Sequence, residues 1–437
     1  MSEQTVSNRS AERRFWISLV ALIAISAMVR MLLIVHLRVR GSWDTQSYVV
    51  VANAIRSLDF HAGYDGRRTP VFPALMILCG MDFDNVRLAQ SLLGIAIAAI
   101  VFAIVWRRTG NATTSFIAGL LSSVGIMELL YEQVVYSETL CTFWIVLSVW
   151  MYARIESQEI LPMRDYVLLG IAAALAGMTR PMFLYLGPLY AALILIRRRR
   201  DIAALVLAPT LLLALGWSMV NARTIGYFGV TTTTGFNLSN HSGAFMELAP
   251  PRYSKIADIY LRYRDYQMEQ MGSQTMTIWL AEGEMERKLG LTHAELSRQL
   301  TRMSLEMFAR HPLLYLESLS RSWARFWGIG FYDFVRSYKQ VVGGGFAYGT
   351  IVAMGTLQLA INAAFLAIAI YLFARWMMKH DRVGFDLAVI AIVLMGSVVQ
   401  AFMEYGENVR YLAPLAPLTI YLVATAITRA RDIANES

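Results

Sequence analysis

The first polar stretch of the sequence follows a long apolar segment and carries several side chains that could take part in chemistry. Asp44 lies four residues before Tyr48, so both side chains would share one face of a helix that begins here. Asp65 precedes an arginine pair, Arg67 and Arg68. A carboxylate can act as a general base, and guanidinium groups bind phosphate through paired hydrogen bonds. Because aspartate is also a common helix cap, this spacing leaves both a functional and a structural role open.

Other ionisable residues lie at the edges of later apolar segments. Glu138 interrupts one apolar run, Arg180 separates two others, and Arg410 precedes the last run after a polar turn that contains Glu404. A charge inside a bilayer is costly, so such residues are functional candidates by default. Each also has a structural interpretation. Glu138 could reach interfacial water, Arg180 could anchor at the level of lipid phosphates, and Arg410 with Tyr411 could belong to an interfacial belt.

The composition points to a membrane protein. Of 437 residues, 57% are of hydrophobic types and only 16% are charged, which is too apolar for an ordinary soluble enzyme. The formal charge of +8 does not indicate a nucleic-acid partner, because the arginines cluster beside apolar segments. The two cysteines, Cys79 and Cys141, lack the spacing of a zinc site or a disulfide framework.

Runs of about 20 apolar residues recur through the chain, and each can cross about 30 Å of hydrocarbon as a helix. We therefore predict an all-α polytopic membrane protein with about ten spans: 15–37, 86–106, 113–131, 134–153, 166–179, 181–196, 202–220, 350–374, 384–402 and 411–428. The first span is longer than a signal-peptide core and is expected to remain as an anchor. Two short spans are predicted on either side of Arg180, because a single crossing would place the arginines 197–200 outside.

The distribution of basic residues predicts the orientation. Lysine and arginine are more numerous in the loops on the side of the N-terminus, so both termini are expected in the cytoplasm. The chain then divides into three parts: an N-terminal membrane module (1–220) with a polar first outer loop (38–85), a large helical outer loop (221–349), and C-terminal membrane helices (350–437). In the outer loop, Thr292 and Glu295 predict a capping box, and Pro312 predicts the start of an amphipathic interfacial helix.

The candidate residues share one depth. All fall at the predicted outer face, and few ionisable residues interrupt the spans deeper in. A secondary transporter would instead place its site near the midplane, often with two matching halves. An outward site suits a lipid phosphate held by arginines, with its headgroup beside a carboxylate base.

Short motifs along most of the chain occur in a recognisable order. They are Asp44 with Tyr48 and Ala52; Arg68, Thr69, Pro70, Val71, Phe72 and Pro73; Ser137, Glu138 and Leu140; a glycine-rich span 170–181 that ends in Arg-Pro; Gly235, Phe236, Asn237 and Leu238; and Arg410, Tyr411, Pro414 and Pro417. Together they resemble the GT-C superfamily of membrane glycosyltransferases, in particular the branch of protein mannosyltransferases and the lipid A aminoarabinose transferase. Each motif is short, so their shared order carries the resemblance.

The resemblance implies an inverting transfer of one sugar from a polyprenyl phosphate to a glycan, lipid or protein acceptor outside the cytoplasm. It implies Asp44 as the base toward the acceptor, supported by Glu138. The expected donor contacts are Tyr48, His61, Arg67, Arg68, Arg180, Arg410 and Tyr411, and the expected acceptor or loop residues are Asp65, Asn237 and Asn240. A bacterial inner membrane is the expected location, with the site on the periplasmic face. Membrane lipids are further partners.

Several points stay open at this stage. Asp44, Thr45 and Gln46 differ from the two acids, spaced by one residue, of metal-dependent GT-C enzymes, so we assign no metal ligand and no certain cofactor. The sequence shows no obvious folded insert beyond the helical outer loop, so a protein acceptor is not implied. Two alternatives to an enzyme are a transporter or flippase of a lipid-linked glycan and a non-catalytic membrane assembly subunit. The sugar and the acceptor are not specified.

Overall fold

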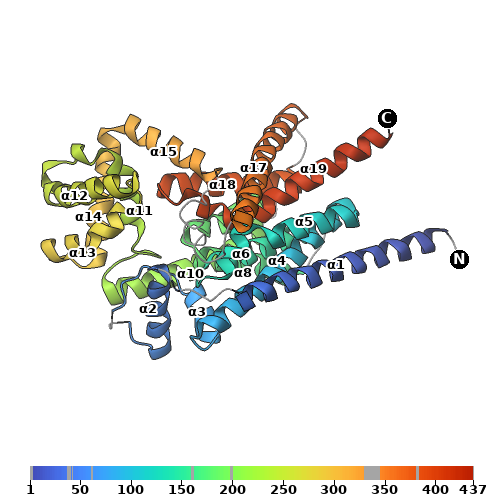
Figure 1. Cartoon of the computed structure of the whole chain (residues 1–437), viewed down its shortest axis with the longest axis horizontal. Helices are drawn as coiled ribbons and strands as arrows, with labels where there is room; N and C mark the ends of the chain where they lie inside the picture. The colour runs from blue at the N-terminus through green and yellow to red at the C-terminus, as the bar shows by residue number, and fades with distance from the viewer. Residues whose placement is uncertain are drawn as a thin grey trace.

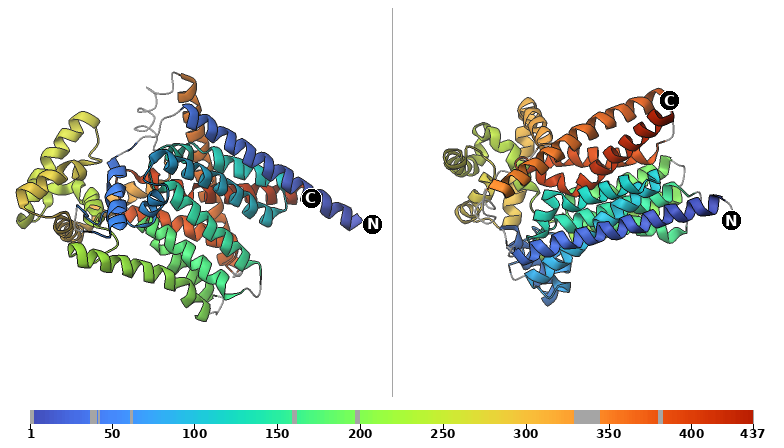
Figure 2. Two further views of the ribbon diagram at one scale, coloured as in Figure 1. Left: turned by 90° about the horizontal axis from the view of Figure 1, so that it is seen from below. Right: turned by 45° about the vertical axis from the view of Figure 1, so that its right-hand side comes forward.

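The long apolar helices lie together as a bundle, and shorter helices form a lobe at one end of it (Figure 1). The computed structural model describes residues 3–36, 41, 43–60, 63–158, 162–196, 200–328, 345–379 and 383–436. Every regular element in these ranges is a helix, as the apolar runs predict. Both ends of the chain lie at the end of the bundle that is farthest from the lobe, in each of the views of Figures 1 and 2. The predicted His61 and the arginine run 197–199 lie outside the described residues.

The predicted spans fall largely on the helices of the bundle. These are α1 (Glu3–His36), α4 (Phe83–Thr109), α5 (Ala112–Val124), α6 (Ile126–Glu132), α7 (Glu138–Glu156), α8 (Met163–Thr179), the 3-10 turn η1 (Pro181–Tyr185), α9 (Leu186–Ile196), α10 (Arg200–Ile225), α17 (Gly345–Lys379), α18 (Phe385–Met403), the 3-10 turns η4 (Asn408–Tyr411) and η5 (Ala413–Leu415), and α19 (Ala416–Glu436). The predicted pair of short helices around Arg180 is present as α8 and η1 with α9.

Not all of these helices are long and apolar enough to cross a membrane independently. In the described residues six qualify, or seven if α5 and α6, which meet at a bend of 48°, form one span. The segment Pro181–Ile196 is apolar but shorter, and α8 has 17 residues. Short helices of this kind are tolerated in a membrane only where protein surrounds them. The protein is thus an all-helical membrane protein, and ten crossings stay a prediction.

Close packing of α8 explains how its short length is accommodated. Its buried residues are mostly alanine and glycine, and small residues allow helix backbones to approach each other in a membrane. A Cβ atom at Gly170 would overlap the backbone of Val206 in α10. Around this contact, α4, α7, α8, α9, α18 and α19 share one buried cluster that includes Tyr152, Tyr190 and Tyr421.

The lobe has a hydrophobic core of its own. The lobe consists of α11 (Thr234–Ser242), the 3-10 turns η2 (Gly243–Leu248) and η3 (Pro251–Tyr253), α12 (Ser254–Met271), α13 (Thr277–Leu289), α14 (His293–Arg310) and α15 (Pro312–Phe326). Thr292 caps α14 in a capping box with Glu295, and Pro312 is the first residue of α15, so both local predictions are confirmed. Trp323 of α15 donates to Ser397 Oγ of α18 over 3.1 Å, which ties the lobe to the bundle.

A buried ion pair lies inside the bundle, where the sequence predicts few charges. Arg30 of α1 pairs with Glu132 at the end of α6, with 2.7 Å between Nη2 and Oε1 and at most 2% of either side chain exposed. Arg30 also donates to Ser123 Oγ over 2.9 Å. Gly94 of α4 leaves room for this pair, because a Cβ there would overlap both Glu132 Oε1 and Arg30 Nη2. Arg30, an ionisable residue, therefore lies inside the predicted first span (15–37), where Glu132 of another helix is its partner.

Replacing Gly94 with alanine is expected to destabilise the bundle. The added methyl group would displace the Arg30–Glu132 pair, and overpacking of this kind costs about 1–3 kcal/mol. Gly216 of α10 provides the control, because a Cβ there meets nothing within 4 Å. Thermal unfolding in detergent should show a lower midpoint for Gly94→Ala and an unchanged or slightly higher one for Gly216→Ala. Equal midpoints for wild type and Gly94→Ala would contradict this assignment.

Candidate active site

A cavity of about 410 Å³ lies where the lobe meets the bundle. Its walls come from α2 (Trp43–Ser57) and the segment 67–69, from η1, from α11 and α13 of the lobe, and from the end of α18 with η4. Elements that are distant in sequence therefore meet at one place. Most of the predicted site residues line this cavity: Asp44, Tyr48, Arg67, Arg68, Arg180, Asn237, Asn240, Arg410 and Tyr411.

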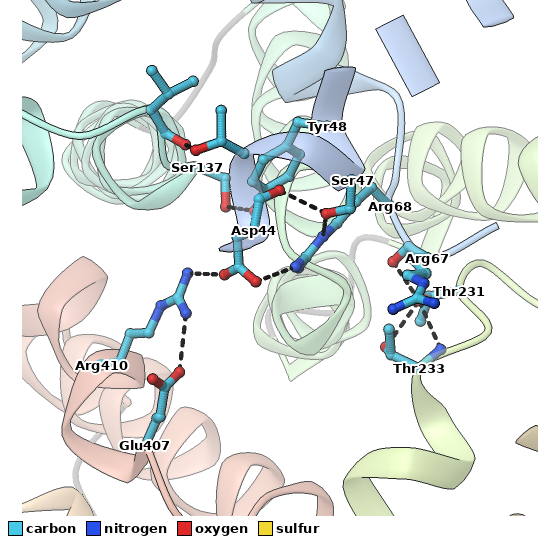
Figure 3. Close-up of polar contacts among 12 residues, drawn as sticks. Asp44, Ser47, Tyr48, Arg67, Arg68, Ser137, Thr231, Thr233, Glu407 and Arg410 are labelled. Atoms are coloured by element: carbon cyan, nitrogen blue, oxygen red, sulfur yellow. Dashed lines mark hydrogen bonds and ion pairs between the residues drawn. The ribbon is translucent and has the colours of Figure 1, made fainter. Parts of the chain in front are cut away.

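Asp44 lies between two arginines (Figure 3). Its Oδ1 accepts a hydrogen bond from Arg68 Nη2 over 2.6 Å, and its Oδ2 accepts one from Arg410 Nη2 over 2.7 Å. Burial acts to raise the pKa of Asp44, but the positive charges of Arg68 and Arg410 outweigh it and hold that pKa well below its usual range. Asp44 is therefore ionised, and both of its oxygens are engaged.

Glu138 lies behind the cavity and holds two of its arginines. It is the first residue of α7 and is 1% exposed. Its Oε1 accepts from Arg180 Nη1 over 2.5 Å and from Arg410 Nε. Arg410 therefore bridges Asp44 and Glu138. A second cavity of about 10 Å³ lies beside Glu138 and is also lined by Glu128 and Glu132, a volume that suits about one water molecule.

Each of the three arginines also lies over a tyrosine ring. The distances from guanidinium carbon to ring centroid are 4.7 Å for Arg68 over Tyr48, 4.9 Å for Arg180 over Tyr411 and 4.4 Å for Arg410 over Tyr136. Cation–π contacts of this kind hold a guanidinium group in a fixed plane. The arginine side chains are thus oriented before any ligand binds.

Breaks in the helices place the side chains of Arg180 and Arg410 at the cavity. Arg180 follows the last residue of α8 in an extended conformation, and Pro181 begins η1. Arg410 lies in η4, a short 3-10 turn before Pro414 and α19. Proline removes a backbone donor and disfavours a helical conformation in the residue before it, so Pro181 accounts for the break at Arg180. The side chains at these breaks therefore enter the site.

Arg67 lines the same cavity but is paired elsewhere. Its Nε donates to Asp65 Oδ2 over 2.5 Å, and its Nη1 donates to Glu282 Oε2 of α13 over 3.1 Å. Thr231 Oγ1 donates to the backbone oxygen of Arg67 over 2.8 Å. Asp65 does not line the cavity. Arg67 and Asp65 thus connect the first loop to the lobe.

A cluster in the lobe was not expected from the sequence. His293 Nδ1 lies 2.9 Å from Glu282 Oε1 and 3.2 Å from Glu286 Oε1. Within the described ranges these three residues form the group of ligand side chains that is close enough to hold a metal ion. The Arg67 guanidinium already contacts Glu282, so this carboxylate has a positively charged partner without a metal ion. The spacing of Glu282 and Glu286 on one helix face could have indicated the cluster.

Further cavity residues lie outside the predicted set. They are Ser47, Ser137, Trp279, Gln400, Glu404 and Glu407, among others. Glu404 and Glu407 belong to the polar turn before the last span, which the sequence does single out. Ser47 accepts a hydrogen bond from Arg68 Nε over 2.7 Å. Trp279 has no sequence signal, because its position depends on the packing of α13.

Raising the pH is expected to weaken the lobe through His293. Burial acts to lower the pKa of His293, but hydrogen bonds to Glu282 and Glu286 outweigh it and raise that pKa above its usual value of 6.5. A raised pKa stabilises the folded state fully below about pH 6.5, and this contribution is lost as the pH rises through the folded-state pKa. The unfolding midpoint should fall between pH 6 and 9 in the wild type and change less in His293→Gln. Parallel pH profiles would contradict this role.

Comparisons with known proteins concern the fold. No protein-family model and no curated protein matches the sequence. The oligosaccharyltransferase AglB from Archaeoglobus fulgidus, in complex with an inhibitory peptide and a dolichol-phosphate, is 13% identical with a TM-score of 0.49, over 97% of this chain and 52% of that one. This chain thus spans about half the length of AglB. ArnT from Cupriavidus metallidurans, in the apo state, is 13% identical with a TM-score of 0.40, over 96% of this chain and 79% of that one.

At such low identity, and with TM-scores under 0.5, these likenesses carry no argument about activity, so the chemistry of the site has to support any function.

Proposed function

We propose that the protein is an inverting glycosyltransferase that moves one monosaccharide from a polyprenyl phosphate to an acceptor hydroxyl at the outer face of the membrane. The observation that carries this proposal is a single cavity in which the Asp44 carboxylate lies between Arg68 and Arg410, with Arg180 nearby on Glu138. A carboxylate beside three arginines offers a base and a phosphate site together.

The cavity suits a donor with a charged head and an apolar tail. Arg68, Arg180 and Arg410 supply the positive charge for a phosphate. Apolar side chains line another part of the wall: Met182, Leu184, Val399 and Met403. Met182 and Leu184 belong to η1, and Val399 and Met403 belong to α18, which are elements of the bundle. An isoprenoid chain could therefore leave the cavity toward the hydrocarbon region while its phosphate stays with the arginines.

The transfer requires a base that takes a proton from the acceptor and positive groups that stabilise the negative charge on the leaving phosphate. The acceptor oxygen attacks the anomeric carbon from the face opposite the phosphate, and its proton passes to Asp44. The bond between the anomeric carbon and the phosphate oxygen breaks, and its electron pair stays on the phosphate. The released phosphate monoester carries more negative charge than the donor, which Arg68, Arg180 and Arg410 stabilise. Inversion follows from the single displacement.

The ion pairs of Asp44 need to change before it can act as a base. With both oxygens bound to arginines its pKa is too low for efficient proton transfer. A donor phosphate attracts the same guanidinium groups, and sharing them weakens their hold on Asp44. The pKa of Asp44 then rises toward its usual range and one oxygen becomes free. Donor binding would thus activate the base.

The placement of the site supports an outer-face reaction. The lobe lies at the end of the bundle opposite both chain termini (Figures 1 and 2), and residues of the lobe line the cavity. The excess of basic residues in the loops on the side of the termini supports a cytoplasmic position for both termini. The active site would then face the periplasm of a bacterial inner membrane, and the acceptor would be a glycan, a lipid or a protein outside the cytoplasm.

Replacing Asp44 with asparagine should abolish transfer without unfolding the protein. Loss of a general base lowers rates by about 10²- to 10⁴-fold. Purified protein in detergent would be incubated with radiolabelled polyprenyl-phosphate sugars and cell-envelope acceptors, and release of polyprenyl phosphate would be measured. Glu317→Gln is the matched control, because Glu317 lies on α15, is 54% exposed and pairs only with Arg321 among the described residues.

This assay, together with a transport assay in vesicles, separates the alternatives. Consumption of one donor by wild type and Glu317→Gln, but not by Asp44→Asn, supports the transferase. A donor that crosses vesicle membranes chemically unchanged indicates a transporter or flippase. Wild-type activity in Asp44→Asn would remove Asp44 from the mechanism.

A further inference from the structure

The cavity has a second wall that is chemically unlike the arginine wall. It is formed by α11, the start of α13 and the end of α18, and its polar groups are Asn237, Asn240, Thr275, Gln400 and Glu404. Amides, a hydroxyl and a carboxyl group both donate and accept hydrogen bonds. Sugar hydroxyl groups also donate and accept hydrogen bonds, so they match this wall better than a phosphate does.

Glu404 differs from the other acids that line the cavity. Asp44 and Glu407 pair with arginines, but Glu404 makes no ion pair within the part of the chain that the structure describes. Its Oε1 instead accepts a hydrogen bond from Asn240 Nδ2 over 2.8 Å. Both residues are buried, with 8% and 5% exposed. A buried carboxyl group without a cation gains from further hydroxyl partners, because an unsatisfied polar group is costly.

The position of Glu404 is fixed by its backbone. The Glu404 carbonyl accepts hydrogen bonds from Ser322 Oγ over 2.6 Å and from Asn408 Nδ2 over 3.0 Å. Its amide donates to the Gln400 carbonyl over 2.9 Å. These contacts come from α15, η4 and α18, so three elements hold the residue. A side chain held in this way can select one arrangement of ligand hydroxyls.

Protonation makes Glu404 suitable for hydroxyl recognition. Burial and the negative charge of Glu407 raise the pKa of Glu404 to about 8. At neutral pH the carboxyl group is then mainly neutral, so it can donate one hydrogen bond and accept others. Two neighbouring hydroxyl groups of a sugar ring can satisfy it together with the Asn240 amide.

An aromatic ring on the same wall suits the apolar face of a sugar. Trp279 lines the cavity and is partly buried. It stacks on Phe236 at 5.1 Å with an interplanar angle of 14°, and Phe236 stacks on His293 at 4.5 Å and 9°. The stack holds the indole in place, and the C–H face of a pyranose or furanose ring packs well on such a surface.

We propose that Glu404, Asn240 and Trp279 form the subsite for the sugar ring of the lipid donor, and that Glu404 determines its specificity for a ring with two neighbouring free hydroxyl groups. The inference rests on the proposed function. Met403 and Val399 of α18 belong to the apolar part of the cavity wall, and Glu404 follows Met403 directly. A ligand whose apolar tail lies along this end of α18 brings its polar head to Glu404, which favours the donor sugar over the acceptor.

Binding measurements can separate the sugar subsite from the phosphate site. The probes are a C55 polyprenyl phosphate and the same lipid linked to mannose, glucose, galactose or arabinose, each titrated into purified protein in nanodiscs without acceptor. Wild type should bind at least one sugar-bearing lipid about tenfold or more tightly than the bare lipid. Glu404→Ala and Asn240→Ala should lose most of this advantage and keep the wild-type affinity for the bare lipid.

Controls distinguish the possible failures. Trp279→Leu removes the aromatic surface without touching the Asn240–Glu404 pair, so it keeps the test meaningful if Glu404→Ala does not fold; Glu317→Gln should behave as wild type. A sugar advantage that persists in Glu404→Ala, Asn240→Ala and Trp279→Leu, or one that is absent in the wild type, would overturn the subsite and leave the phosphate site intact. Wild type that binds neither kind of lipid would contradict the proposed function itself.

Discussion

The site depends on one shared guanidinium group. Arg410 contacts Asp44 through Nη2 and Glu138 through Nε, and so joins α2, α7 and the turn before α19. Removing one member would leave a buried charge without its partner, which costs several kcal/mol, about 3–5 in proteins. The bundle and the first loop are therefore joined by balanced charges, and the same balance makes the cavity a place where a phosphate can compete for the arginines.

Breaks in the helices make this balance possible in an apolar protein. Arg180 follows the end of α8, and Arg410 lies in a 3-10 turn. Irregular backbone within a membrane protein is tolerated only where protein or a polar cavity surrounds it. Here the breaks border the cavity at the lobe end, while the interior of the bundle is held by small residues such as Gly170 and by the isolated Arg30–Glu132 pair.

Sequence patterns predict the parts of this protein better than their contacts. Apolar length predicts the bundle, and local rules predict the capping box at Thr292 and the helix that begins at Pro312. The charged residues at the cavity can also be recognised one by one, because a charge beside an apolar run is unusual. Their pairing cannot, because the chain offers many arginines and the choice of Arg410 for both Asp44 and Glu138 depends on tertiary packing.

The missed features have the same origin. Arg30 and Glu132 are distant in sequence, and a pair of opposite charges is visible only once α1 and α6 meet. Glu404 belongs to a polar turn that the sequence marks, but its hydrogen bond with Asn240 depends on how α11 packs against the end of α18. Trp279 and the Glu282–His293 contact depend on how α13 packs in the lobe. The bend between α5 and α6 lies at Gly125, whose non-helical backbone apolar length does not predict.

In the proposed mechanism the Asp44 carboxylate and the donor phosphate compete for Arg68 and Arg410. The most direct test is the affinity of wild type and Asp44→Asn for bare polyprenyl phosphate in nanodiscs, with folding checked by thermal unfolding. We expect Asp44→Asn to bind this lipid at least as tightly as wild type, and several-fold more tightly if the freed arginines keep their orientation on Tyr48 and Tyr136. A tenfold or greater loss of affinity in a folded Asp44→Asn protein would contradict this competition, because Asp44 would then be required to hold the arginines for the phosphate.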